Sequence, residues 1–144
     1  MGYDITWIND NLAISGAIDS YEKLSELGID IVVNIRAEQH DDIPTLTTRG
    51  ISYYWIPVSD YFEARTFQIQ SFVNIIKKNP NRKILVHCAL GIGRSAMLIC
   101  AYLIETKSMS VDESVEYLTD LRPIVRLSPP QINKLRIYYE NYYK

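Results

Sequence analysis

Apolar residues follow two spacings along this chain, and the two alternate from one end to the other. Continuous runs rich in β-branched and aromatic residues predict buried strands at 29–35, 51–58 and 83–87. Segment 5–15 predicts a hairpin of two further strands, turned at Asn9-Asp10-Asn11. Apolar residues at helical spacing predict helices at 66–79, 94–105 and 110–121, followed by a last helix from Pro129 onward. This alternation predicts an α/β domain with a central, mostly parallel sheet of about five strands.

Capping patterns place several of the helix ends. Asp19 with Glu22 three positions later has the spacing of a capping box, and Gly28 is suited to end the short helix that follows. Ser110 with Glu113 repeats the pattern before the helix at 110–121. The polar stretch 36–50 is expected to be loop with some helix. The helix at 66–79 is expected to bury one side, which carries Phe67, Phe72, Val73, Ile75 and Ile76.

Composition excludes several classes of function. The 144 residues fit one domain, 1–144, and the formal charge of −2 comes without the basic stripe of a nucleic-acid binder. The longest apolar run, 96–104, is too short to span a bilayer. Only Cys88 and Cys100 occur, and neither has the spacing of a zinc site or a disulfide framework. We therefore expect a cytoplasmic monomer that uses no metal and binds neither membrane nor duplex nucleic acid.

The stretch ILVHCALGIGRSAMLIC, residues 84–100, places candidate chemistry at a strand-to-helix turn. Gly91, Gly93 and Ala96 fit the letters of a dinucleotide-binding fingerprint. However, three residues separate the strand from the first glycine, and no second strand ending in an acidic residue follows the helix. The ATP-binding loop pattern also fails, because no lysine follows either glycine.

A phosphate-binding loop that contains a nucleophile fits the same stretch better. Backbone N–H groups at a helix N-terminus can surround an anion, and Gly91 and Gly93 permit the tight dihedral angles that this needs. Arg94 adds a planar fork that can hold two phosphate oxygens. The same positive potential can lower the pKa of a cysteine to about 3.5–7.5, so Cys88 is expected to be a nucleophilic thiolate.

Two neighbours of this loop have expected supporting roles. Ser95 follows Arg94 closely enough for its hydroxyl to reach the Cys88 sulfur. His87 precedes the nucleophile, and its ring can hold the loop through hydrogen bonds.

The pattern His87-Cys88-x-x-Gly91-x-x-Arg94-Ser95 resembles the signature of the cysteine-dependent protein phosphatases. The chain length and flanking segments are similar to those of the small, atypical dual-specificity branch. The segments LAISG, VVNIR, WIPVSD, KILVHCALGIGRSA, AYLI and LRP follow that family's order over most of residues 5 to 135. The resemblance implies a central sheet flanked by helices, transfer through a cysteinyl-phosphate and no cofactor or metal.

Site roles follow from the resemblance position by position. It implies that Asp60 in WIPVSD is the general acid, with Glu63 as the reserve candidate, and that Ser95 eases departure of the thiolate. Gln131 matches a residue that positions the hydrolytic water, although a related glutamine position holds Leu127. The substrate phosphate is expected to bind the loop residues Ala89, Leu90, Gly91, Ile92, Gly93 and Arg94.

Three further side chains have less defined expected roles. Asp41 and Asp42 lie in a loop that could shape the pocket mouth. Arg126 could contact a second phosphate of the substrate, or it is a solvated surface charge.

The substrate class is also an expectation from the resemblance. It implies hydrolysis of phosphotyrosine, with phosphoserine and phosphothreonine, in proteins or peptides. The uncharged loop positions Ala89, Leu90 and Ile92 disfavour highly charged inositol lipids, which would gain from lysines there. An RNA 5′-triphosphatase, another phosphomonoesterase on the same fold, and a phospho-binding module without turnover are the alternatives.

Overall fold

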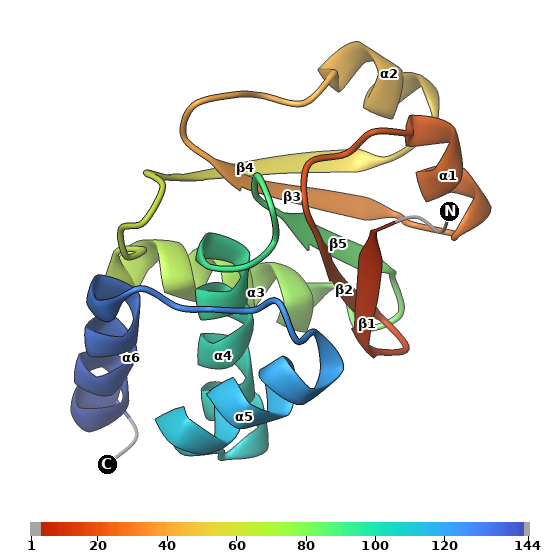
Figure 1. Ribbon diagram of the computed structural model, residues 1–144. Coiled ribbons are helices and arrows are strands. Elements are labelled where there is room, and N and C mark those ends of the chain that lie inside the picture. The colour runs from red at the N-terminus through yellow and green to blue at the C-terminus, as the bar shows by residue number, and fades with distance from the viewer. Residues whose placement is uncertain (1–3, 143–144) are drawn as a thin grey trace.

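A five-stranded sheet forms the centre of the protein, in the order β1-β2-β5-β3-β4. The computed structural model describes residues 4–142 (Figure 1). The strands are β1 (Ile5–Asn9), β2 (Leu12–Ser15), β3 (Ile31–Arg36), β4 (Ser52–Val58) and β5 (Ile84–His87). Only β1 pairs in the antiparallel sense, with β2; the other three pairings are parallel. The predicted fold class, including the hairpin and the mostly parallel sheet, is confirmed.

Helices cover both faces of this sheet. On one face lie α1 (Tyr21–Glu26) and α2 (Ile43–Thr48). On the other lie α3 (Thr66–Lys78), α4 (Arg94–Lys107), α5 (Val111–Leu121) and α6 (Pro129–Tyr142), as Figure 1 shows. Successive strand residues point to opposite faces, so Val32 packs with the α1–α2 layer and Val33 with the larger helical layer. The helix α4 is buried along most of its length, which explains its apolar sequence.

Two local expectations need correction. The N-cap of α1 is Ser20, whose hydroxyl accepts the Lys23 N–H at 3.2 Å, so the capping box expected at Asp19 and Glu22 is not formed. The other end of α1 agrees with the expectation, because Gly28 follows the helix with a φ of +77°. In α3, Phe67 is 60% exposed rather than buried, because the buried face runs through Ile69, Phe72 and Val73 and Phe67 lies off that face.

The topology brings three loops together. In parallel strands the carboxyl ends lie at one edge of the sheet, so the loops after β3, β4 and β5 emerge side by side. These loops begin at residues 37, 59 and 88 respectively. Among the described residues, no helix is long and apolar enough to cross a membrane.

Candidate active site

The loop between β5 and α4 curls around the sulfur of Cys88. Cys88 directly follows β5, is 3% exposed, and its Sγ accepts the backbone N–H of Gly91 at 3.3 Å. Gly91 has a φ of +67°, and a Cβ added there would lie 2.5 Å from the Ser15 carbonyl oxygen. Glycine is therefore required at this position both by the backbone conformation and by the close approach of β2.

Neighbouring segments hold this loop from outside. The buried Arg122 guanidinium donates to the carbonyl oxygens of Gly91 at 2.9 Å and Leu90 at 3.0 Å, and it also contacts Asp4 at 3.0 Å. Further along the loop, the Arg126 N–H donates to the Ile92 carbonyl oxygen at 2.8 Å. The carbonyl oxygens of Leu90, Gly91 and Ile92 are therefore all bound by residues outside the loop.

Arg94 begins α4, and its side chain is only 1% exposed. Its Nη1 and Nη2 donate to the two carboxylate oxygens of Glu38, at 2.7 and 3.0 Å, and Nη1 also donates to the Val58 carbonyl oxygen. The buried Nε has no hydrogen-bond partner among the described residues. One edge of the guanidinium is thus held by Glu38, while the Nε–Nη2 edge remains available for two oxygens of an anion.

The ion pair also changes the titration of its members. The hydrogen bond from Arg94 lowers the pKa of Glu38 from its usual 4.5 to about 2. Burial acts to lower the pKa of Arg94, but the hydrogen bond to Glu38 and the nearby charges of Cys88 and Asp60 outweigh it, and the net shift is upward. Arg94 is therefore a permanent cation in this site.

Asp60 stands at the rim of the same pocket. Its Oδ1 lies 3.6 Å from Arg94 Nε and accepts the Tyr61 N–H at 2.9 Å, and its side chain is 85% exposed. The chain turns sharply here, since Tyr61 has a φ of +73°. The carboxylate is thus close to the free edge of Arg94 and accessible to a ligand, as a general acid requires.

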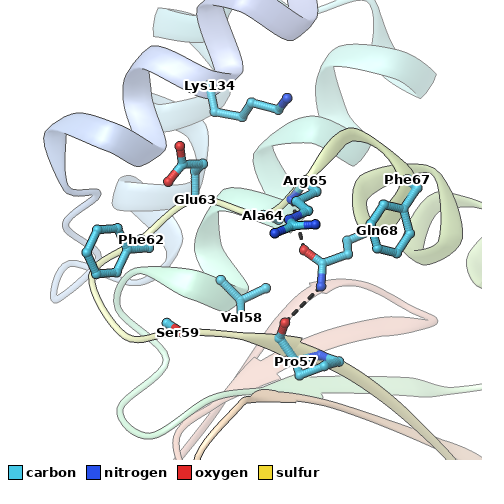
Figure 2. A pocket seen from close by; sticks show the side chains of 10 residues that line it. All are labelled: Pro57, Val58, Ser59, Phe62, Glu63, Ala64, Arg65, Phe67, Gln68 and Lys134. Atoms are coloured by element: carbon cyan, nitrogen blue, oxygen red, sulfur yellow. Dashed lines mark hydrogen bonds between the residues drawn. The ribbon is translucent and has the colours of Figure 1, made fainter.

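Glu63 points to a different place. With Arg65 and Lys134 it lines a separate pocket of about 560 Å³, whose lining residues include neither Cys88 nor Arg94 (Figure 2). The segment 59–65 therefore divides the two pockets, with Asp60 facing one and Glu63 the other. This arrangement favours Asp60 over Glu63 as the acid.

Ser95 and Cys100 differ in their relation to the nucleophile. Ser95 Oγ is fully buried and has no hydrogen-bond partner among the described residues, so its expected contact with the sulfur stays a prediction. Cys100 lies within α4, and burial raises the pKa of its thiol to about 12, against a smaller opposite effect of Ser114. Cys100 is therefore a core residue, as its sequence position indicates.

Gln131 and Arg126 line the Cys88 pocket, whose volume is about 410 Å³. The buried Gln131 side chain accepts the Ser128 N–H at 2.9 Å and donates to the Phe62 carbonyl oxygen at 3.1 Å. It thereby connects α6 to the segment that carries Asp60, and its role toward a water molecule stays a prediction. Arg126 is exposed at the rim. Within residues 4–142, no cluster of His, Cys, Asp and Glu could hold a metal ion.

Comparison with known proteins gives the family. The sequence model of the dual specificity phosphatase catalytic domain matches residues 14–141. The chain belongs to the dual-specificity phosphatase family. Phosphatidylglycerophosphate phosphatase PTPMT2 of Arabidopsis thaliana is 32% identical over 130 residues, which cover 85% of this chain and 57% of that protein. Dual specificity protein phosphatase 21 of Homo sapiens is 30% identical over 130 residues, covering 86% of this chain and 66% of that protein.

Solved structures share the fold. The active form of Tk-PTP superposes with a TM-score of 0.84 at 21% identity, covering 99% of both chains. Human DUSP28 superposes with a TM-score of 0.84 at 20% identity, covering 100% of this chain and 98% of the other. The resemblance inferred from the sequence is therefore confirmed for family and fold. The chain spans 57% and 66% of the length of the two curated relatives described above.

Sequence reasoning missed two residues of the site and misplaced a third. Glu38 lies in the polar stretch after β3, where nothing marks one acidic residue over another. Asp41 in the same stretch was expected at the pocket mouth, but its carboxylate contacts His87. Arg122 belongs to the quoted LRP segment, but its bond to the loop depends on a contact across 31 residues of sequence. The order of parallel strands was the missing information, since it decides which loops meet.

Proposed function

We propose that this protein hydrolyses phosphate monoesters through a cysteinyl-phosphate intermediate. The observation that carries the proposal is the free, buried edge of Arg94 in the pocket that Cys88 lines. A buried guanidinium donor without a partner is costly, and a phosphate dianion in the loop would satisfy it. The family to which the chain belongs supports the same chemistry.

The reaction has two steps. Cys88 Sγ attacks phosphorus and forms the S–P bond while the ester P–O bond breaks, and Asp60 gives its proton to the leaving oxygen. Water then attacks phosphorus, the S–P bond breaks, Asp60 accepts the proton and orthophosphate leaves. Arg94 stabilises the equatorial oxygens in both transition states, and Ser95 stabilises the departing thiolate.

As substrates we propose phosphotyrosine, with phosphoserine and phosphothreonine, in proteins. The walls of the pocket support this choice, because Tyr61, Leu90, Ile92 and Leu127 offer apolar surface to an aromatic ring or a short side chain. Arg126 at the rim adds a cation that favours an acidic residue or a second phosphate beside the scissile group.

A phosphorylated lipid is the second candidate, and two observations favour it. The relative from Arabidopsis thaliana is described as a phosphatidylglycerophosphate phosphatase. At the pocket mouth, Tyr61 and Leu90 are 57% and 63% exposed, and exposed apolar side chains around a site are typical of contact with a partner or a lipid surface.

The deciding experiment compares substrates and two cysteine variants. A phosphotyrosine peptide, a phosphoserine peptide, phosphatidylglycerophosphate in detergent and a 5′-triphosphorylated RNA are assayed at equal concentration for phosphate release. We expect the highest kcat/KM for the phosphotyrosine peptide. A higher value for the lipid or the RNA would overturn the protein substrate and keep the chemistry.

The variants test the chemistry itself. Cys88→Ser should reduce turnover to background while orthovanadate still binds, because serine keeps the shape but is a far weaker nucleophile. The control Cys100→Ala changes a core cysteine and should keep turnover close to that of the wild type. Turnover that survives Cys88→Ser would refute the mechanism, and vanadate binding without turnover in the wild type would indicate a phospho-binding module.

A further inference from the structure

A buried carboxylate contacts the histidine that precedes the nucleophile. Asp41 Oδ2 lies 2.6 Å from Nε2 of His87, and the two side chains are 7% and 0% exposed. The other ring nitrogen, Nδ1, lies 3.2 Å from the carbonyl oxygen of Cys88. Asp41 therefore lies beneath the catalytic loop and not at the pocket mouth, where the sequence had suggested it.

The loop that carries Asp41 is itself firmly placed. Tyr53 Oη on β4 accepts the Asp41 N–H at 3.4 Å and the side-chain amide of Asn34 at 3.0 Å. Glu38, three residues earlier in the same loop, accepts hydrogen bonds from the Arg94 guanidinium. One loop after β3 thus supplies a carboxylate to each end of the phosphate-binding loop, at His87 and at Arg94.

Hydrogen-bond chemistry restricts the protons on the imidazole. A carboxylate and a peptide carbonyl are both acceptors, so each ring nitrogen of His87 faces a group that cannot donate. A ring with a bare Nδ1 would turn a lone pair toward the lone pairs of the Cys88 carbonyl oxygen. The favourable arrangement has Nε2–H donating to Asp41 and Nδ1–H donating to Cys88, with the carboxylate balancing the charge of the ring.

We propose that Asp41 is a positioning residue of the catalytic loop. By holding Nε2 of His87 it keeps Nδ1–H directed at the Cys88 carbonyl oxygen, and this fixes the first peptide group of the loop. That peptide sets the direction in which the Cys88 sulfur and the following N–H groups point, so a misplaced ring would misalign the nucleophile. The inference rests on the proposed function for its effect on rate, but the ring protons can be observed without turnover.

Other ionisable groups surround the pair. On the phosphate-binding loop these are Cys88 and Arg94. The remaining titratable neighbours are Glu38, His40 and Asp42 in the same loop as Asp41, Tyr53 on β4 and Tyr21 on α1. From the adjacent strands β2 and β3, the register partners of His87 are Ser15 and Asn34, which do not titrate. Among the described residues, the hydrogen-bond contacts of the His87 ring are with the Asp41 carboxylate and the Cys88 carbonyl oxygen.

The first test is spectroscopic. The chain has two histidines, so ¹⁵N-histidine labelling with a His40→Gln variant for assignment isolates the His87 ring signals. We expect protons on both ring nitrogens in the wild type, because each nitrogen faces an acceptor. In Asp41→Asn we expect one proton, on Nδ1, because the side-chain amide can donate to Nε2 and leave Nδ1–H on the Cys88 carbonyl. A wild-type ring protonated only on Nε2 would overturn the proposal.

The second test is kinetic and uses rescue. Asp41→Ala removes the partner of Nε2, and we expect kcat to fall by about 10-fold to 100-fold, the range known for outer partners of histidines in metal sites. Asp41→Asn should recover most of this loss. A loss in Asp41→Asn as large as in Asp41→Ala would overturn the positioning role, and so would an unchanged kcat in Asp41→Ala.

Asp42→Asn is the matched control. Asp42 caps α2 by accepting from Thr45 N and Oγ1, and asparagine can also cap a helix, so kcat and the His87 signals should match those of the wild type. An equal effect of Asp42→Asn would show that any change in this loop disturbs the site, and it would refute a specific role for Asp41. Failure of the wild type to turn over any substrate would refute the proposed function alone, because the ring signals remain measurable.

Discussion

Gly91 and Gly50 have nearly the same backbone conformation in very different surroundings. Their φ angles are +67° and +72°, in the left-handed region that side chains disfavour. A Cβ on Gly50 would meet nothing within 4 Å, whereas a Cβ on Gly91 would lie 2.5 Å from Ser15 O and 2.8 Å from Arg122 Nη2. Comparing substitutions at the two glycines therefore separates the free-energy cost of a left-handed φ from the free-energy cost of steric crowding.

Alanine at each position measures these costs. Gly50→Ala should lower the free energy of unfolding by about 1–2 kcal/mol, the cost of a left-handed L-residue. Gly91→Ala should lose a further 1–3 kcal/mol or so from crowding, and its kcat should fall because the N–H that contacts the Cys88 sulfur moves. Urea unfolding and phosphatase assays on both variants provide the measurement. If the two variants lose the same stability and Gly91→Ala keeps its kcat, β2 moves away from the added methyl group without a free-energy cost, and the crowding argument is wrong.

At the scale of elements, the loops after three parallel strands each supply different residues of the site. The loop after β5 supplies Cys88, the loop after β3 supplies Glu38 and Asp41, and the loop after β4 supplies Asp60. Asp60 and Glu63 belong to the same segment but face separate pockets. Arg94 at the end of the first loop binds both Glu38 and the Val58 carbonyl oxygen, so the three loops meet at this guanidinium.

Asp60→Asn tests the assignment of the acid within this segment. Asparagine can still accept the Tyr61 N–H, so the turn should be kept, but it cannot protonate a leaving oxygen. For a tyrosyl or alkyl leaving group, kcat should fall by about 10²–10⁴. For an activated aryl phosphate, whose leaving group departs as an anion, the loss should be much smaller. Rates on both substrate types provide the measurement.

Glu63→Gln is the control for this comparison. It changes a carboxylate in the same segment, but on the side that faces Arg65 and Lys134 (Figure 2), so both rates should stay near those of the wild type. If Asp60→Asn loses the same factor on both substrates while Glu63→Gln shows the leaving-group dependence, the roles are reversed.

The positions of the strands and helices could be predicted from the sequence better than the contacts between them. Strand and helix positions follow from local periodicity, and the capping box at Ser110 and Glu113 is formed as expected. The start of α1 differs by one residue: Asp19 and Ser20 are both good caps, and it is the Ser20 hydroxyl that accepts the Lys23 N–H. Cys88, Arg94 and Asp60, which line one pocket, could be picked out in advance because they lie in recognisable local patterns. Glu38 and Arg122 could not, because their roles depend on which loops the sheet brings together.

At the scale of the whole molecule, the loop between β5 and α4 is tied to distant parts of the chain by two ion pairs. Arg94 binds Glu38 after β3, and Arg122 binds Asp4 before β1. The hydrogen bond from Arg122 lowers the pKa of Asp4, and that from Arg94 lowers the pKa of Glu38 to about 2. In both cases the carboxyl group binds protons more readily in the unfolded chain than in the folded one, so acid weakens the folded state.

The pH dependence of stability therefore has a predicted sign and window. The contribution of Glu38 is complete above its unfolded pKa of about 4.5 and is lost as the pH falls toward its folded pKa of about 2. Glu38→Gln should accordingly be less stable than the wild type at pH 6, and the difference should shrink as the pH falls from 5 to 3. Urea unfolding at several pH values measures it. The neighbouring neutral variant Gln39→Ala exchanges no proton, so its difference from the wild type should be the same at every pH. A difference for Glu38→Gln that is equally constant would show that the Arg94–Glu38 pair adds nothing to folding, and Glu38 would then serve only to orient Arg94.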